Sequence, residues 1–347
     1  MANTLDKTEN TAEIADSNER RQFLGGGLAL GAAGVLSQFA SSEAHAQGSA
    51  GMAGAQPAPI TDVRGKVAYI TAASNGIGLG IARALSNAGM KVVIGYRNEE
   101  RLSRALPLLG ENNPNVLAIK HDVTHRDGWQ RMLDEVNDRF GNLHVLVNNA
   151  GIKTMSQASQ ATWSEWDNAV GVNLTGIYNG VSTCLPHMKA HGEGAQIVTT
   201  CSMSGLLPGA TAGVYTTTKI AAVGLMEALR VELQGTTVGT SAYCPGLVIT
   251  ENDPSVELKG FGAIGMDPLE AGERVLNGIL NNDLFILTHP EFKDGMQERF
   301  DSIIDSIPDE NETVPESRLE GSAVVLHSDI YPKEIAHRAV KRNSYKN

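Results

Sequence analysis

Short apolar runs alternate along the chain with longer segments of helical periodicity. The apolar runs, rich in Val, Ile, Leu and Ala, occupy residues 66–71, 91–96, 116–121, 143–147, 196–200, 237–243 and 284–288. Such runs predict buried strands, and the segments between them predict helices at about 81–88, 128–139, 163–185, 215–234, 269–280 and 292–307. This alternation predicts a single α/β domain with a doubly wound parallel sheet, which binds its ligands at the carboxyl ends of the strands.

The amino-terminal part of the chain has the layout of an export signal. Arg20 and Arg21 precede an uncharged run of Gly, Ala and Leu at 25–39, which is shorter than the roughly 20 residues of a membrane span. Ala44-His45-Ala46 supplies the small-x-small pattern at which signal peptides are cleaved. The paired arginines resemble a twin-arginine export signal, although Glu19 stands where Ser or Thr is usual. A buried helix is the alternative, and the consecutive glycines at the start of the run disfavour it.

These features divide the chain into a twin-arginine signal peptide at 1–46, a flexible linker at 47–60, a folded domain at 61–310 and a polar carboxyl-terminal arm at 311–347. The twin-arginine export machinery is then an expected partner. The periplasm is the expected location, with the cytoplasm as the alternative.

Composition narrows the class of partner. With 41% hydrophobic and 19% charged residues the chain is globular, and its formal net charge of -11 argues against nucleic acid or an anionic membrane as main partner. The three cysteines, Cys184, Cys201 and Cys244, form no CxxC pattern, so no metal site is expected. Each lies in an apolar segment, which predicts buried free thiols. A disulfide between Cys201 and Cys244, both near strand ends, is the alternative.

A glycine-rich turn follows the first predicted strand. It runs from Ala72 to Gly80, has glycines at 76, 78 and 80, and leads into a helix. Strand, glycine turn and helix form the unit that cradles phosphates in dinucleotide-binding folds, because the backbone approaches closely and the helix amino terminus attracts anions. The G-x-G-x-x-G pattern is absent, so this feature alone is only suggestive.

Tyr215 and Lys219 are the strongest candidate chemistry. They stand four residues apart at the start of an apolar-periodic segment, so they lie on one face of the predicted helix. A cation held beside a phenol favours the phenolate, which makes such a tyrosine usable as a general acid or base. An exposed Tyr and a solvated Lys are the alternative for so short a pattern.

Several segments in the correct order resemble the short-chain dehydrogenase/reductase family over about residues 61–288. The Thr-Gly-x-x-x-Gly-x-Gly turn of that family appears as Thr71 to Gly78, its Asn-Asn-Ala-Gly segment as Asn148 to Gly151, and its Asn-Leu-x-Gly segment as Asn173 to Gly176. Ser202 precedes Tyr215 by thirteen residues, as in the family. Ala72 is the departure, because it replaces the first glycine and its Cβ would crowd or alter the turn.

The resemblance implies a Rossmann-type enzyme that interconverts a secondary alcohol and a ketone by hydride transfer. The catalytic residues that it implies are Asn173, Ser202, Tyr215 and Lys219. Tyr215 would exchange the proton, Lys219 would hold the nicotinamide ribose and Ser202 would bind the reacting oxygen. Asn173 would order a water, with a structural role in bracing its helix as the alternative. The implied cofactor-binding residues are Thr71, Ser74, Asn75, Gly76, Ile77, Gly78, Arg97, Asp122, Val123, Asn149, Ala150, Gly151, Tyr215, Lys219, Pro245, Gly246, Val248 and Thr250.

The choice of cofactor is expected to be made just after the second strand. An acidic side chain there would bind the 2′-hydroxyl of NAD, but Tyr96 is followed by Arg97 and no carboxylate occurs before Glu99. In the family an arginine at this position faces the 2′-phosphate, so NADP is expected and NAD is the alternative. The alternative for Arg97 is a solvated arginine at the start of a helix, without a role in cofactor binding.

The substrate is constrained only loosely. Lys153–Met155, Leu206–Pro208 and 247–268 are expected to line its pocket, and their apolar character favours a neutral, bulky alcohol or ketone. The segment Phe285–Phe292 is similar to bacterial family members that act on aromatic or steroid-like alcohols. An NAD-dependent polyol or sugar dehydrogenase is one alternative, and a non-catalytic dinucleotide-binding redox sensor is another. The resemblance also implies a homo-oligomer, a dimer or a tetramer.

Overall fold

The computed structural model of the chain describes residues 56–209, 211–250, 265–308 and 328–344. The predicted signal peptide, most of the linker, much of the 247–268 segment and part of the carboxyl-terminal arm lie outside the described residues. None of the described helices is long and apolar enough to span a bilayer.

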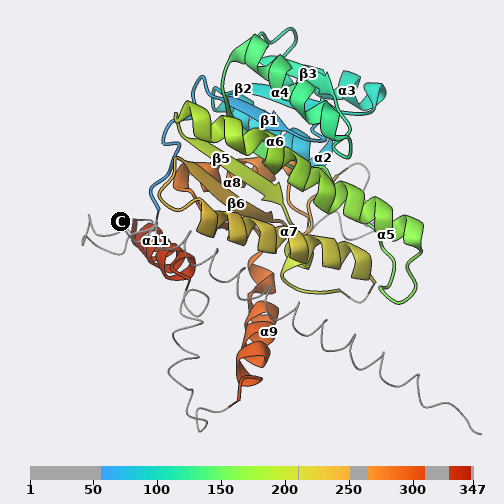
Figure 1. Cartoon of the computed structure of the whole chain (residues 1–347), viewed down its shortest axis with the longest axis vertical. Coiled ribbons are helices and arrows are strands. Elements are labelled where there is room, and N and C mark those ends of the chain that lie inside the picture. Colours follow the sequence, from blue (N-terminus) through green and yellow to red (C-terminus); the bar gives the residue numbers. More distant parts are fainter. Residues whose placement is uncertain (1–55, 210, 251–264, 309–327, 345–347) are drawn as a thin grey trace, which may run out of the picture. The chain divides into compact units, whose positions relative to one another are not determined.

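The described residues form one α/β domain around a seven-stranded sheet (Figure 1). The strands are β1 (Val67–Ile70), β2 (Lys91–Tyr96), β3 (Val116–Lys120), β4 (Leu143–Asn148), β5 (Ala195–Thr200), β6 (Val238–Cys244) and β7 (Phe285–Leu287). All pairings are parallel, in the order β3-β2-β1-β4-β5-β6-β7. The order reverses between β1 and β4, which is where doubly wound sheets bind ligands. The predicted fold class is confirmed.

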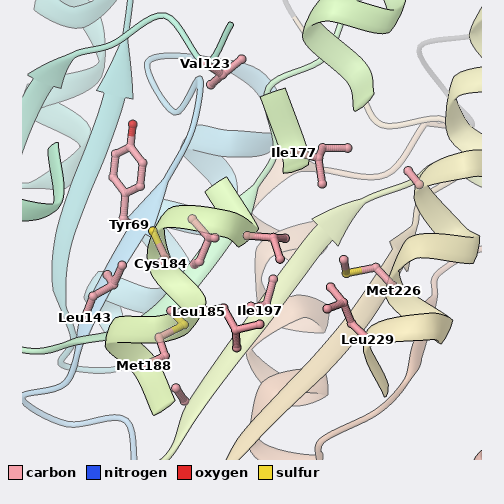
Figure 2. Close-up of a cluster of buried hydrophobic side chains, with 14 of the residues drawn as sticks. Tyr69, Val123, Leu143, Ile177, Cys184, Leu185, Met188, Ile197, Met226 and Leu229 are labelled. Carbon is pink, nitrogen blue, oxygen red and sulfur yellow. The ribbon is translucent and has the colours of Figure 1, made fainter. Parts of the chain in front are cut away.

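Helices cover both faces of the sheet. On one face α2 (Gly76–Asn87) packs against α8 (Pro268–Asn281), and Leu102 of α3 (Glu99–Ala105) joins the same apolar cluster. On the other face, α4 (Arg126–Phe140), α6 (Gly176–His191) and α7 (Gly213–Glu232) bury a second cluster. Figure 2 shows Cys184 and Met188 of α6 beside Ile197 of β5, with Met226 and Leu229 of α7 nearby. These two clusters fix the strands and so the positions of the residues that follow them.

Some helices differ from the sequence prediction. α2 begins at Gly76, inside the glycine turn, whereas the predicted helix begins at about residue 81. The sequence did not indicate the first turn of α2 because glycine has a low helix propensity. The predicted helix at 163–185 divides into α5 (Trp163–Val170), a π-helical turn (Gly171–Thr175) and α6, which continues through Pro186 to His191. The sequence did not predict α3. The helix predicted at about 292–307 is present as α9 (Lys293–Asp305).

A further helix, α11 (Ile330–Ser344), closes one edge of the sheet and was not predicted. Glu334 accepts a hydrogen bond from the Leu284 amide, 3.2 Å away, and Arg338 donates to the Phe285 carbonyl. β7 is an edge strand, and such edges expose backbone groups that pair with other chains. Side chains of α11 therefore bond backbone groups that the edge would otherwise leave open.

Candidate active site

A cavity of about 720 Å³ opens at the carboxyl edge of the sheet, a volume in the range of ligand pockets. The structure brings together there every predicted cofactor-binding residue except Thr71. The lining includes Ser74, Asn75, Gly76, Ile77, Gly78, Arg97, Asp122, Val123, Asn149, Ala150, Gly151, Ser202, Tyr215, Lys219, Pro245, Gly246, Val248 and Thr250. These residues come from seven separate segments. Most follow the carboxyl ends of strands, and Tyr215 and Lys219 lie in the first turns of α7.

Thr71 lies behind the cavity and organises it. The side chain is buried, and its hydroxyl accepts hydrogen bonds from the backbone amides of Asn149 and Ala150, both at 2.8 Å. The Asn149 amide group in turn donates to the Thr71 carbonyl at 3.1 Å. Thr71 therefore joins the ends of β1 and β4, and we assign it a positioning role in place of direct contact with a ligand.

The glycine turn has the features of a phosphate cradle. A Cβ on Gly78 would stand 2.5 Å from Asn149 Nδ2 and 2.7 Å from the Ala72 carbonyl, so only glycine allows this approach. The first turn of α2 carries no acidic side chain, which leaves its amino terminus favourable to an anion. Asn75 Nδ2 is buried and has no hydrogen-bond partner among the described residues. A buried donor without a partner is costly, so these residues fit a dinucleotide whose phosphates they would bond.

Ala72 adopts a left-handed conformation with φ of 52°. The turn therefore keeps the backbone that glycine would adopt, and the alanine side chain is accommodated at a cost in strain of about 1–2 kcal/mol.

Replacing Ala72 by Gly should stabilise the protein. The relief of strain exceeds the added entropy of the unfolded chain, so we expect a net gain of about 0.5–1 kcal/mol in the free energy of unfolding. Urea unfolding at 25 °C measures it. Ala73→Gly, at a buried position that is not among the left-handed residues, is the matched control and should destabilise. Equal effects of the two substitutions would contradict the assigned strain.

The proton-transfer residues stand on α7 and at the end of β5. Lys219 is buried, its Nζ donates to the Thr200 carbonyl at 2.6 Å, and the same atom lies 5.5 Å from the centre of the Tyr215 ring. Tyr215 is half-buried and, like Ser202, lines the cavity. Ser202 has φ of 75°, a strained conformation that is typical of functional positions. A buried cation beside a phenol that opens on a cavity is an arrangement suited to acid–base chemistry.

Asn173 lies within the π-helical turn, where the Gly176 amide bonds to the Gly171 carbonyl. Its side-chain oxygen accepts from the Ile152 amide at 2.8 Å, and its Nδ2 donates to the Ile152 carbonyl at 3.0 Å and to Thr218 Oγ1 at 3.1 Å. Asn173 is fully buried and does not line the cavity. Its side chain braces α7 against the segment after β4, which agrees with the structural alternative, and π-turns of this kind are frequent at functional sites.

Arg97 lines the cavity and pairs with a second predicted residue. Its Nη1 lies 3.1 Å from Asp122 Oδ2. Burial alone would raise the pKa of Asp122, but hydrogen bonds from Thr124 and from the Arg97 guanidinium lower that pKa to about 2. Asp122 is therefore a carboxylate at neutral pH, and it orients the guanidinium at the mouth of the cavity.

Sequence reasoning missed several residues that line the cavity. Tyr96, Asn98, Arg101, His121 and Thr200 also line the cavity. Most of them lie at or directly after the carboxyl ends of β2, β3 and β5, so their position at strand ends was the available signal. Leu206, expected to line a substrate pocket, is buried in the apolar core instead, whereas Lys153 and Ile152 do line the cavity.

The three cysteines are free and buried, as predicted. Burial raises the pKa of Cys184 to about 12, so its thiol stays protonated. No group of three or more His, Cys, Asp or Glu side chains suited to a metal ion occurs in the part of the chain that the structure describes.

Known proteins resemble this chain in sequence and in fold. A family model described as short chain dehydrogenase matches residues 66–259. A protein named C alpha-dehydrogenase from Sphingobium sp. (strain SYK-6) is 30% identical over 269 residues, which cover 72% of this chain and 88% of that protein. The solved apo form of LigD from Sphingobium sp. strain SYK-6 is 31% identical with a TM-score of 0.64, covering 72% of this chain and 100% of that chain. A short chain dehydrogenase/reductase from Burkholderia phymatum, solved in complex with NAD, is 28% identical with a TM-score of 0.66, covering 74% of this chain and 100% of that chain.

Proposed function

This chain belongs to the short-chain dehydrogenase family of oxidoreductases, and we propose that it interconverts a secondary alcohol and a ketone with a nicotinamide cofactor. One observation carries the proposal. The buried Lys219 ammonium lies beside the Tyr215 ring at the cavity that also contains the glycine turn, so acid–base and dinucleotide-binding groups share one site.

The roles of the residues follow from their positions. Bound nicotinamide dinucleotide would supply the hydride donor or acceptor. Tyr215 gives a proton to the carbonyl oxygen in reduction and takes it from the alcohol in oxidation. Ser202, on the same cavity, donates a hydrogen bond to that oxygen and stabilises the charge that develops on it. Lys219 is held beside the Tyr215 ring by the hydrogen bond that its Nζ donates to the Thr200 carbonyl.

We propose a neutral, bulky and apolar substrate. Ile152 and Val172 are apolar side chains that line the same cavity as Tyr215 and Ser202, which supports an apolar substrate. Similarity to a protein named C alpha-dehydrogenase supports a dehydrogenation at a carbon atom of the substrate.

A substrate panel tests the function. Aromatic, steroid and polyol alcohols are each incubated with NADP and with NAD, and formation of reduced nicotinamide is followed by absorbance. We expect the enzyme to turn over the aromatic or steroid alcohols, and we expect Tyr215→Phe to abolish this turnover. Turnover of polyols alone would overturn the apolar substrate, and the absence of turnover together with nucleotide binding would favour a redox sensor.

We propose NADP as the cofactor, because Arg97 is a cation at the cavity mouth beside the phosphate cradle. Arg97→Asp removes that cation and adds a carboxylate near Asp122, so we expect the KM for NADP to rise by about tenfold while the KM for NAD changes less. The Arg97 side chain is 64% exposed, so the difference should shrink as salt is added. Steady-state kinetics with both cofactors measure the ratio. Arg139→Asp, at the opposite end of α4 from Asp122, is the charge-matched control, and equal changes for both nucleotides would refute the assignment.

We propose a homo-oligomer that uses the α5–α7 side of the molecule. Large apolar side chains are exposed on these helices: Trp163 (82%), Tyr178 (57%), Val231 (46%) and Ile220 (38%). Apolar side chains gathered on neighbouring helices are typical of interfaces. Light scattering of the purified protein gives its mass, and a monomer at micromolar concentration would contradict this assembly.

We propose export through the twin-arginine route, on the basis of Arg20 and Arg21 ahead of an uncharged run. Changing both arginines to lysine keeps the charge but removes the pair that serves as the address, so we expect the precursor to accumulate in the cytoplasm. Cell fractionation and the size of the mature protein report the result. If the variant with both substitutions were found in the periplasm in its mature form, another signal would direct export of the chain.

A further inference from the structure

His289 lies at the carboxyl end of β7, on the same edge of the sheet as the candidate active site. Its ring contacts the loop that follows β6: the Gly246 amide donates to Nδ1 at 3.1 Å, and Nε2 lies 3.0 Å from the Leu247 carbonyl. Thr288 Oγ1 is 2.6 Å from Nδ1. The histidine thus bonds two consecutive residues of one loop through its two ring nitrogens.

These partners fix the tautomer of His289. The Leu247 carbonyl only accepts hydrogen bonds, so Nε2 carries the proton and donates it. The Gly246 amide only donates, so Nδ1 is unprotonated and accepts. The Thr288 hydroxyl then also donates to Nδ1. The ring therefore uses one nitrogen as donor and the other as acceptor.

Gly246 is the residue that allows this contact. A Cβ at Gly246 would stand 2.6 Å from His289 Cγ and 2.8 Å from Nδ1, so no other residue fits beneath the ring. Phe292 packs edge-on against the other part of the ring at 6.2 Å. The ring is held between the loop and the start of α9.

The loop that His289 holds forms one wall of the cavity. Pro245, Gly246, Val248 and Thr250 line it, and the Pro245 carbonyl accepts from the Met203 amide, next to Ser202. We propose that His289 is a positioning residue that fixes this wall for the nicotinamide cofactor by clamping Gly246 and Leu247. This inference rests on the proposed function, and it assigns a role to a side chain that does not itself line the cavity.

Three substitutions of His289 test the hydrogen bonds of its two ring nitrogens separately. His289→Asn keeps an acceptor near the place of Nδ1, His289→Gln keeps a donor near the place of Nε2, and His289→Leu keeps neither. Glu291→Gln, an exposed neighbour in the turn that follows, is the control. For each full-length variant, calorimetry gives the Kd for NADP and NAD, and thermal unfolding gives Tm.

We expect His289→Leu to bind nucleotide about tenfold more weakly, as the loss of two hydrogen bonds implies, and His289→Asn to recover most of this loss. Glu291→Gln should bind as the wild type does. A wild-type Kd for His289→Leu would overturn the proposal. So would equal weakening in all three variants, because the Nδ1 acceptor would then have no part in it.

A measurement without nucleotide separates this inference from the proposed function. Hydrogen exchange of peptides covering 244–250 should quicken in His289→Leu and His289→Gln, which lose the acceptor for Gly246, and stay near wild type in His289→Asn. If wild-type protein binds neither nucleotide, the proposed cofactor is wrong, and this exchange pattern still decides whether the clamp exists. Unchanged exchange in all variants refutes the clamp.

Discussion

Tyr215→Phe should lower kcat by about 10²- to 10⁴-fold, the usual contribution of a positioned general acid or base. The substitution removes only the phenolic hydroxyl. The ring remains on α7 beside Lys219, whose Nζ keeps its bond to the Thr200 carbonyl, so the cavity and the Kd for nucleotide should change little. Single-turnover kinetics with the best alcohol from the substrate panel, together with calorimetric nucleotide binding, measure both quantities.

Tyr178→Phe is the matched control for this prediction. Tyr178 lies on α6, is 57% exposed and is not among the residues lining the cavity. Its loss of a hydroxyl should leave kcat unchanged. A Tyr215→Phe variant that keeps more than about a tenth of wild-type turnover would exclude Tyr215 as the proton-transfer residue.

Gly78→Ala should weaken nucleotide binding by about tenfold to a hundredfold, because overpacking typically costs about 1–3 kcal/mol. The added Cβ would stand 2.5 Å from Asn149 Nδ2 and 2.7 Å from the Ala72 carbonyl, so the turn must open or Asn149 must leave the Thr71 carbonyl. Either change moves the backbone of the cradle. Calorimetry measures the Kd, and circular dichroism checks that the fold persists.

Gly224→Ala is the companion variant. Gly224 lies in α7 with no heavy atom within 4 Å of the position of an added Cβ. Alanine there should leave nucleotide binding unchanged and stabilise the helix by about 0.5–1 kcal/mol. Unchanged binding in Gly78→Ala would mean that the glycine turn does not hold the nucleotide.

The strands could be predicted from apolar runs, and most of the site could be predicted from the motifs that resemble the short-chain dehydrogenase/reductase family. The apolar run at 91–96 coincides with β2, and most of the predicted site residues follow strands or lie in the first turns of helices, where a parallel sheet gathers them. Burial sets the positions of the strands, and periodicity in the sequence reports burial.

Other features depend on contacts between distant residues. The positive φ of Ala72 follows from the turn around it, and the enclosure of Asn173 by Ile152 and Thr218 follows from packing between segments. His289 is 43 residues from Gly246 in the chain, and no local pattern pairs them. α11 bonds the edge of β7 largely through the polar side chains of Glu334 and Arg338. It carries few apolar residues, so hydrophobic periodicity did not predict this helix.

α11 can cover the edge of β7 only after the rest of the sheet has been synthesised, because α11 comes last in the chain. A chain is made from its amino terminus, so Glu334 and Arg338 leave the ribosome after all seven strands and the candidate site have been made. During that interval the outer edge of β7 lacks the Leu284 and Phe285 contacts that α11 later supplies, and an unpaired edge is open to a strand of another chain. The edge of β7 is therefore covered only after the rest of the sheet has been synthesised, and a chain interrupted before residue 330 lacks these contacts at that edge.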